Sequence, residues 1–264
     1  MDEYEDNFRI VTTTGDSWQD TSLNHLYILD KNLEIIGKVE GLAQGERIYS
    51  SRFLGDKLYL VTFRQVDPFF VIDLSNPEKP EILGYLKIPG YSSYLHPYDE
   101  AHIIGIGQDD RNLKISLFDV SDFTNPEETA KYSVNEDYSY SDALYDHKAF
   151  LFDKEKELLV IPVSYNSYQK IEGREWQYWQ GAFVFKMNAD EIILRGKITH
   201  HESEEMWDDY VRRTLYIDDA LYTISSSFVK ANNLGTLAPI SQVDLGYEEP
   251  NILYEETVVS QNVK

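Results

Sequence analysis

The sequence of 264 residues contains no cysteine. Disulfide scaffolds, thiolate metal sites and cysteine nucleophiles are therefore excluded. Basic residues are also scarce, because 24 Lys and Arg stand against 46 Asp and Glu and leave a formal net charge of −22. Phosphate backbones and anionic bilayers bind positive surfaces, so we expect neither a nucleic acid nor an anionic membrane as a partner.

Long apolar runs and helical patterns are scarce as well. No run of about 18 apolar residues is present, which argues against membrane insertion. The segment Met1–Asp6 is acidic and does not look like a signal peptide. The best helical stretch, His201–Asp209, is short and acidic. The sequence is instead 42% hydrophobic and has 20 Tyr and 12 Phe, a mixture that favours β-strands around a packed core.

Pairs of strand-like segments repeat along the chain. Each pair has a first strand that ends near Asp or Asn, a short turn and a second strand. The first strands begin at Leu26, Phe70, Ile115, Phe183 and Phe228, with spacings of 44, 45, 68 and 45 residues. Two further strand-like segments precede most of the pairs. Four strands with a period near 45 residues are typical of a propeller blade.

We therefore predict an all-β fold, a single β-propeller domain of about five four-stranded antiparallel blades. The repeats are expected at residues 1–46, 47–90, 91–136, 137–200 and 207–247, with a loop insertion at 164–181 that accounts for the long spacing. The C-terminal tail, residues 248–264, includes an alternating stretch from Asn251 to Val259. We predict that this tail pairs with first-repeat strands and closes a monomeric ring; an open arc that dimerises is the alternative.

Two turns share the pattern Asp-x-Ser followed by Asn-Pro. They are Asp73–Pro80 and Asp119–Pro126. Asp, Ser and Asn side chains bond to their own backbone in tight turns, and proline fixes the dihedral that follows. We interpret these acidic residues as hairpin-turn residues rather than ligands.

The run Arg52–Pro77 resembles the archaeal and bacterial "beta-propeller domain" family, whose members are described as secreted and distantly related to WD-repeat propellers. The likeness continues through Ile88–Asp99, Ile104–Gly107 and Asp142–Asp153 and covers nearly the whole chain. The resemblance implies a propeller fold and an extracellular or cell-surface setting, but no defined activity. Typical members are longer and carry a signal peptide, so the chain is similar to the C-terminal part of such a protein.

The innermost strand of each blade lines the axis, where propellers commonly bind ligands. Aligned repeats place four cationic or titratable residues at or near the start of these strands: Arg52, His96, His147 and Arg213. In a chain of charge −22 such a cluster would suit an anion or a carboxylate. The alternative is that these residues pair with local acids, such as Asp99, Asp142 and Asp146, and fix loops.

The predicted insertion carries five aromatic residues: Tyr165, Tyr168, Trp176, Tyr178 and Trp179. Among them Trp176, Tyr178 and Trp179 are candidate binding residues, because aromatic side chains stack on sugars or bury a protein partner's surface. The alternative is a small satellite core against the blade edge. We accordingly expect a protein or carbohydrate ligand.

Catalysis is the rival hypothesis. Propellers host glycoside hydrolases that use paired carboxylates in the funnel, and Asp99, Asp142 and Asp146 are candidates. No Gly-x-Ser-x-Gly, Walker or His-Glu-x-x-His motif is present. His96 with Asp99 matches no fixed zinc spacing, and His200 with His201 is interpreted as part of a solvated connector. We predict a non-catalytic binding or scaffolding module without a cofactor or metal; diffuse Ca²⁺ binding by acidic loops stays an open alternative.

Overall fold

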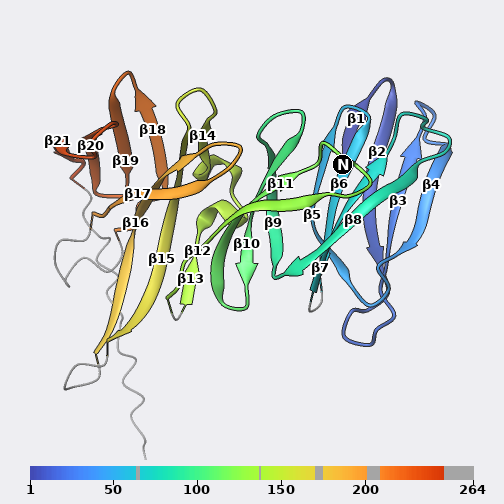
Figure 1. The fold of residues 1–264 in the computed structure, drawn as a ribbon, viewed down its shortest axis with the longest axis horizontal. Coiled ribbons are helices and arrows are strands. Elements are labelled where there is room, and N and C mark those ends of the chain that lie inside the picture. Colours follow the sequence, from blue (N-terminus) through green and yellow to red (C-terminus); the bar gives the residue numbers. More distant parts are fainter. Residues whose placement is uncertain (64–65, 137, 170–174, 201–208, 247–264) are drawn as a thin grey trace, which may run out of the picture.

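The structure is a computed structural model of the chain, and it describes residues 1–246 except 64–65, 137, 170–174 and 201–208. The strand-like segments form five antiparallel sheets, and in four of these sheets all consecutive strands are neighbours (Figure 1). The predicted all-β fold of five four-stranded blades is therefore confirmed. The two helical pieces are single 3-10 turns, and no helix within the described ranges is long and apolar enough to cross a bilayer.

Each blade is a meander that runs from an innermost to an outermost strand. Blade 1 consists of β1 (Asp2–Tyr4), β2 (Asn7–Thr14), β3 (Leu23–Leu29) and β4 (Ile35–Leu42). Blade 2 consists of β5 (Arg47–Leu54), β6 (Lys57–Phe63), β7 (Val66–Asp73) and β8 (Glu81–Pro89). Blade 3 consists of β9 (Tyr91–Pro97), β10 (His102–Asp109), β11 (Asn112–Asp119) and β12 (Glu127–Ser133).

Blade 4 departs from this plan because its innermost strand is split in two. It consists of β13 (Tyr138–Tyr140), the turns η1 (Asp142–Leu144) and η2 (His147–Ala149), β14 (Leu151–Asp153), β15 (Leu158–Gln169), β16 (Glu175–Met187) and β17 (Ile192–Ile198). Both β13 and β14 pair with β15. Blade 5 consists of β18 (Arg213–Ile217), β19 (Ala220–Ile224), β20 (Phe228–Asn233) and β21 (Pro239–Asp244).

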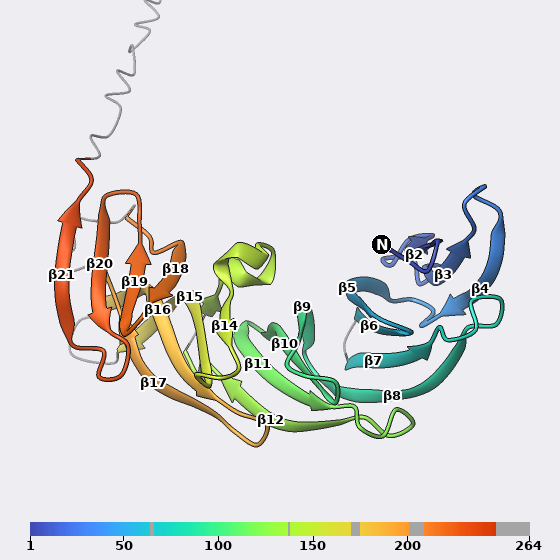
Figure 2. The same ribbon diagram turned by 90° about the horizontal axis from the view of Figure 1, so that it is seen from above.

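The five blades follow one another along an arc, with blades 1 and 5 at its two ends (Figure 2). The strands β5, β9 and β18 lie on the concave side, and the outermost strands, such as β8 and β12, lie on the convex side. The described sheets therefore do not close a ring among themselves. The predicted closure by the tail falls on residues 248–264, outside the described part, and stays a prediction.

The predicted loop insertion at 164–181 is wrong for residues 164–169 and 175–181, which are strand residues of a lengthened β-hairpin. The pairing of β15 with β16 continues without interruption from Leu158↔Lys186 to Gln169↔Glu175. The segment Glu175–Tyr178 alternates polar and aromatic residues, and that period of two fits a strand. The long repeat spacing thus reflects a lengthened hairpin within one blade.

The hydrophobic core lies between the blades. Side chains alternate along a strand, so each central strand contributes to two interfaces. In β6, Leu58 and Leu60 belong to a cluster shared with blade 1, whereas Tyr59 and Val61 belong to a cluster shared with blade 3. Two further clusters join blade 3 to blade 4 and blade 4 to blade 5. Each blade thus buries its faces only against its neighbours.

A β-bulge recurs in the outermost strand of every blade, and a small residue follows it. These post-bulge residues are Gly37, Gly84, Ala130, Gly196 and Ser241. A Cβ at Gly84 would lie 2.5 Å from the carbonyl oxygen of Phe123, in the β11–β12 turn of the next blade. A Cβ at Gly37 would lie 1.9 Å from the carbonyl oxygen of Pro77, in the β7–β8 turn. The small residue therefore lets the next blade's outer turn dock.

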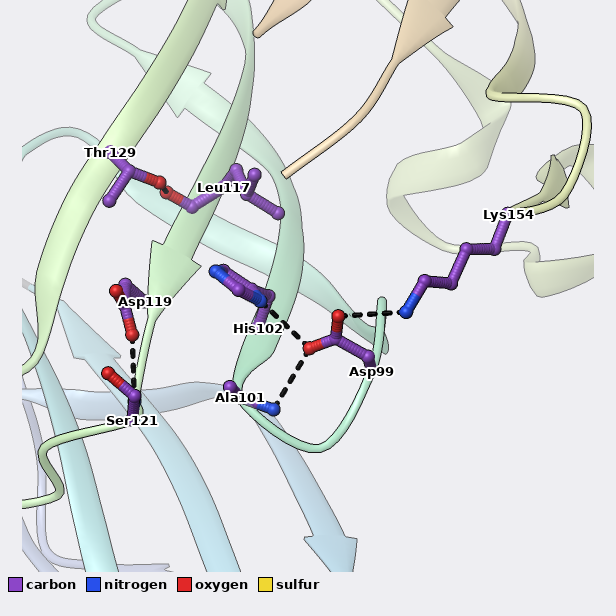
Figure 3. Close-up of polar contacts among 8 residues, drawn as sticks. All are labelled: Asp99, Ala101, His102, Leu117, Asp119, Ser121, Thr129 and Lys154. Atoms are coloured by element: carbon purple, nitrogen blue, oxygen red, sulfur yellow. Dashed lines mark hydrogen bonds and ion pairs between the residues drawn. The ribbon is translucent and has the colours of Figure 1, made fainter. Parts of the chain in front are cut away.

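The predicted turn chemistry of the Asp-x-Ser segments is borne out by the hydrogen bonds. The backbone N–H of Ser121 donates to Asp119 Oδ1 at 2.8 Å, as Figure 3 shows. Ser75 donates to the two carboxylate oxygens of Asp73, from its N–H at 3.3 Å and from its hydroxyl at 2.8 Å. In Figure 3, Thr129 Oγ1 also donates to the Leu117 carbonyl at 3.3 Å, at the bulge of blade 3. These side chains shape the outer hairpins.

We predict that Gly84→Ala destabilises the protein by about 1–3 kcal/mol, because the added methyl group overlaps the backbone of the next blade. The matched control is Ser241→Ala at the same position of blade 5, which is exposed and should change stability by less than about 0.5 kcal/mol. Chemical denaturation of both variants at low protein concentration measures the difference. Equal effects of the two substitutions would contradict the docking role.

Candidate functional site

The structure places Arg52 on β5 and His96 on β9, two neighbouring innermost strands, as the repeats predict. Burial, and then the nearby positive charge of Arg52, lower the pKa of His96 to about 4. The imidazole is therefore neutral at pH 7 while the guanidinium is charged. The concave side of the arc carries a single cation here rather than a pair.

His96 lies in a box of aromatic rings. Its Nδ1 is 3.1 Å from the hydroxyl of Tyr94, and its ring centroid is 4.8 Å from that of Phe150 and 5.6 Å from that of Phe152. The two phenylalanines follow η2, so the split strand of blade 4 brings them against blade 3. This box explains why the charged imidazolium is disfavoured.

Arg52 has no hydrogen-bond or ion-pair partner among the described residues, and its Nε is buried. A guanidinium that stays charged and keeps free donors can accept an anion or a carboxylate. The Arg52 side chain is therefore the part of the predicted cationic cluster that is open to a ligand.

The other two predicted residues lie in a different place. His147 is exposed on η2, and Arg213, at the start of β18, forms an ion pair with Asp146. Asp146 also caps η2 by accepting the N–H of Lys148 at 2.9 Å. The four residues thus form two pairs rather than one cluster. For Arg213 the alternative interpretation, pairing with a local acid, is the observed one.

Asp99, a candidate catalytic carboxylate, instead joins two blades (Figure 3). Its Oδ1 accepts the N–H of Ala101 at 2.9 Å and lies 2.8 Å from His102 Nδ1. Its Oδ2 accepts from Lys154 Nζ, in blade 4, at 2.8 Å. Burial raises the pKa of Asp99, but the bonds from Lys154, His102 and Ala101 outweigh it and lower that pKa to about 2. A general acid requires a raised pKa, so Asp99 lacks this property.

The extended hairpin divides its aromatic residues between two faces. Trp179 stacks on Tyr165 with ring centroids 5.2 Å apart, lies beside Phe183 at 5.2 Å, and is covered by the ammonium group of Lys197. It belongs to the satellite core of blade 4, which is the alternative that the sequence left open. Trp176 pairs with Tyr168 in the register, and both side chains lie outside the described part.

Tyr178 points to the opposite face and lines two cavities of about 280 and 340 Å³. Three residues line both cavities: Tyr140, Ser164 and Tyr178. The first cavity reaches blade 5 at Tyr210 and Arg212, and the second reaches blade 3 at Gln108 and Arg111. Residues from three blades therefore meet around one tyrosine of the hairpin.

The split strand of blade 4 shapes these cavities. Ser139 Oγ accepts the N–H of Leu113 at 2.6 Å, which ties β13 to β11 of blade 3. Ser141 then caps η1 by accepting the N–H of Ala143 at 3.2 Å, and the chain turns away from β15. Because β13 ends opposite Ser164 and β14 pairs only with Leu158–Val160, Pro162 and Val163 of β15 have no inner partner strand and line the first cavity.

The polar groups around Tyr178 are well defined. Burial, followed by its hydrogen bond and charge interaction with Tyr210, raises the pKa of Tyr178, so its phenol stays protonated. The Tyr210 ring lies 6.0 Å away in an edge-on arrangement. Gln180 holds Val211 at both backbone groups, accepting its N–H and donating to its carbonyl at 2.8 Å. The wall around Tyr178 is thus rich in hydroxyl groups, and each cavity also has one arginine and one aspartate: Arg212 with Asp142 in the first, and Arg111 with Asp110 in the second.

His200 is buried, which corrects the interpretation of a solvated connector. It is 1% exposed, and its two ring nitrogens each lie 2.8 Å from a hydroxyl, that of Ser225 and that of Thr223. Ser225 in turn donates to buried Asp209 at 2.8 Å. The serine lies between the histidine and the aspartate, so the order differs from that of a catalytic triad. These contacts fasten the connector to blade 5; His201 lies outside the described residues.

Sequence reasoning found Tyr178 but missed the residues that surround it. Tyr140 and Tyr210 lie 38 and 32 residues away from Tyr178 in the chain and come from strand ends without a motif. The only signal was the repeated tyrosine–serine pattern from Tyr138 to Ser141. Among the described residues, no group of three or more His, Asp or Glu side chains could hold a metal ion.

We predict that His96 makes the protein less stable as the pH falls from 6.5 to 4. The pKa of His96 is lower in the folded state than its usual value of 6.5, so the unfolded chain binds the extra proton in this range. In His96→Phe this contribution is removed, and the free energy of unfolding should fall less between pH 6.5 and 4. Denaturation at several pH values measures the difference, and parallel curves for the two proteins would refute the assignment.

Comparisons with known proteins agree with the fold. A family model described as "Beta propeller domain" matches residues 1–237. An uncharacterised protein of Methanocaldococcus jannaschii is 44% identical over 229 residues, which cover 86% of this chain and 33% of that protein. An uncharacterised protein of Archaeoglobus fulgidus is 38% identical over 245 residues, with coverages of 93% and 34%. The chain thus spans about a third of the length of these relatives.

One solved structure has a similar fold at low sequence identity. Apo AztD from Citrobacter koseri superposes with a TM-score of 0.54 over 93% of this chain and 58% of AztD, at 14% sequence identity. At that identity the likeness concerns the fold alone. The family match over most of the chain, the two archaeal relatives and the five consecutive blades lead to one conclusion: the chain belongs to the beta-propeller domain family.

Proposed function

We propose that this propeller domain is a non-catalytic binding module whose ligand is a carbohydrate held in the two cavities around Tyr178. The observation that carries the proposal is the meeting of three blades around a wall rich in tyrosine and hydroxyl groups. Tyrosine rings offer a flat apolar face with a hydroxyl at the edge, and sugars present both apolar faces and hydroxyl groups.

The size and chemistry of the cavities support a small polar ligand. Ligand sites commonly have volumes of about 300–1,000 Å³ and a few fixed polar groups. Ser164 and Asn166 add hydroxyl and amide groups from β15, and Arg111 and Arg212 lie at the two outer ends. Asp142 and Asp110 line the same two cavities, so each cavity offers a charged donor and a charged acceptor to the hydroxyl groups of a saccharide.

The glycoside hydrolase alternative gains no specific observation. The pKa of Asp146 is lowered, by the Lys148 N–H and by Arg213, as is that of Asp99. The raised pKa of Glu46 follows from its burial, and its Oε2 accepts the hydroxyl of Thr62 at 2.6 Å. An extracellular or cell-surface setting is part of the proposal and rests on the family resemblance.

We predict that Tyr178→Ala weakens the binding of the oligosaccharide that the unchanged protein binds best by at least about tenfold, which corresponds to a loss of ~1.4 kcal/mol. Tyr178 lines both cavities, so its removal takes away the shared wall. Isothermal titration calorimetry against a panel of neutral and acidic oligosaccharides measures the affinity.

Tyr85→Ala is the matched control, because Tyr85 is a 58% exposed tyrosine on the outermost strand of blade 2. This variant should bind as the unchanged protein does. The proposal fails if no oligosaccharide of the panel binds, or if Tyr178→Ala binds as tightly as Tyr85→Ala does.

A further inference from the structure

Within the described part of the chain, each of the two end blades of the arc has one face that no other blade covers. Inside the arc, the central-strand residues that point to the next blade are fully covered, as Tyr59 at 1% and Ile104 at 0% exposure show. In blade 5 the buried Leu221 contributes to the cluster with blade 4, so its strand neighbours point the other way. On that side no described residue covers the sheet.

The uncovered face of blade 5 is apolar. Leu215 and Ile217 pair with Tyr222 and Ala220, on the side opposite to Leu221, and are 40% and 58% exposed. Val243, on the outermost strand β21, is 58% exposed. The inner blades cover such positions with the next blade, so this face has the composition of an interface between blades.

Blade 5 also carries an empty docking position. Ser241 follows the bulge of β21 and pairs with Ala231, just as Gly196 follows the bulge of β17 and pairs with Val184. A Cβ at Gly196 would lie 2.7 Å from Leu237 Cδ1, in the outer turn of blade 5. Leu237 is thus the side chain that seats over the small residue of blade 4. Ser241 is exposed and has no such side chain above it.

Blade 1 carries the matching side chain at the other end of the arc. Leu33 occupies the place in the β3–β4 turn that Leu237 occupies in the β20–β21 turn: both precede the residue that closes the hairpin. Their φ angles are +63° and +60°, a conformation that is unfavourable for leucine. Leu237 packs against the blade 4–blade 5 cluster, whereas Leu33 is 70% exposed. Ile35, which follows it, is 57% exposed.

We propose that two copies of this chain associate head to tail, with blade 1 of one copy docked on blade 5 of the other as if it were the next blade. Leu33 of one copy then seats over Ser241 of the second copy. The chain thus carries, at its two end blades, both halves of the contact that Leu237 and Gly196 form between blades 4 and 5. After this first contact, blade 5 of the first copy and blade 1 of the second copy are still free. A second contact of the same kind between them closes a two-fold dimer.

The association is tested by sedimentation velocity over a range of protein concentrations. Two variants are compared with the unchanged protein, and each alters one of the two surfaces that meet in the contact. Leu33→Glu replaces the docking leucine side chain with a charged one. Ser241→Trp fills the space above residue 241 in which Leu33 of the other copy would lie. The unchanged protein should associate, and each variant alone should associate at least tenfold more weakly, because both joints of a variant dimer are spoiled.

A mixture of the two variants separates this arrangement from others. Leu33→Glu keeps an intact blade 5 face, and Ser241→Trp keeps an intact blade 1 face. One unaltered contact can therefore form between these two faces, and heterodimers should appear. A contact between two blade 5 faces, or between two blade 1 faces, would be insensitive to one of the two variants. Mixing the two variants would then not restore the association. Either observation overturns the head-to-tail joint.

Ile193→Glu is the matched control, since Ile193 is a 46% exposed isoleucine on the outermost strand of blade 4, away from both end faces. It should associate normally. A chain that is monomeric at every concentration overturns the proposal, because the faces are then left bare or are covered by other means. If only a chain shortened to residues 1–249 associates, the tail is the occupant and the second copy is not.

Discussion

The fold depends on the burial of two apolar faces per sheet. Central strands with continuous apolar runs, such as Leu58–Val61 of β6, make sheets that are apolar on both faces, and a single four-stranded sheet cannot cover either face by itself. In this chain the cover comes from the blade before and the blade after, as the division of β6 between two clusters shows. The core is therefore a series of four interfaces, and the small residue after each outer bulge lets the next turn come close enough to seal them.

The same constraint leaves other parts of the blade free to differ. Innermost strand ends and hairpin tips are not needed to cover a neighbour, so blade 4 can split its first strand and lengthen its central hairpin without loss of the repeat. The cavities around Tyr178 arise at this departure from the repeat. The proposed ligand site thus lies at the one irregular blade, between the regular blades on each side of it.

Patterns that are local in sequence were predictable, and contacts between distant segments were not. The four-strand repeat and the aspartate turns follow from alternation and turn chemistry, and the alignment of repeats brought Arg52 and His96 to adjacent strands. The burial of His200 depends on Thr223 and Ser225 of the next blade, which no local pattern reveals. The insertion was predicted as a loop because the long spacing between repeats was given more weight than the alternation of polar and aromatic residues within it. The meeting of Tyr140 with Tyr178 required the split strand, for which the sequence gives no signal.

Hydrogen exchange of the intact chain at low concentration tests most directly whether stability comes from the interfaces between blades. The account predicts that amides of β10 and β11, in a blade covered on both faces, exchange at least about tenfold more slowly than those of β19 and β20, which are covered on one face. Equal protection of the two blades, or slower exchange in blade 5, would contradict it.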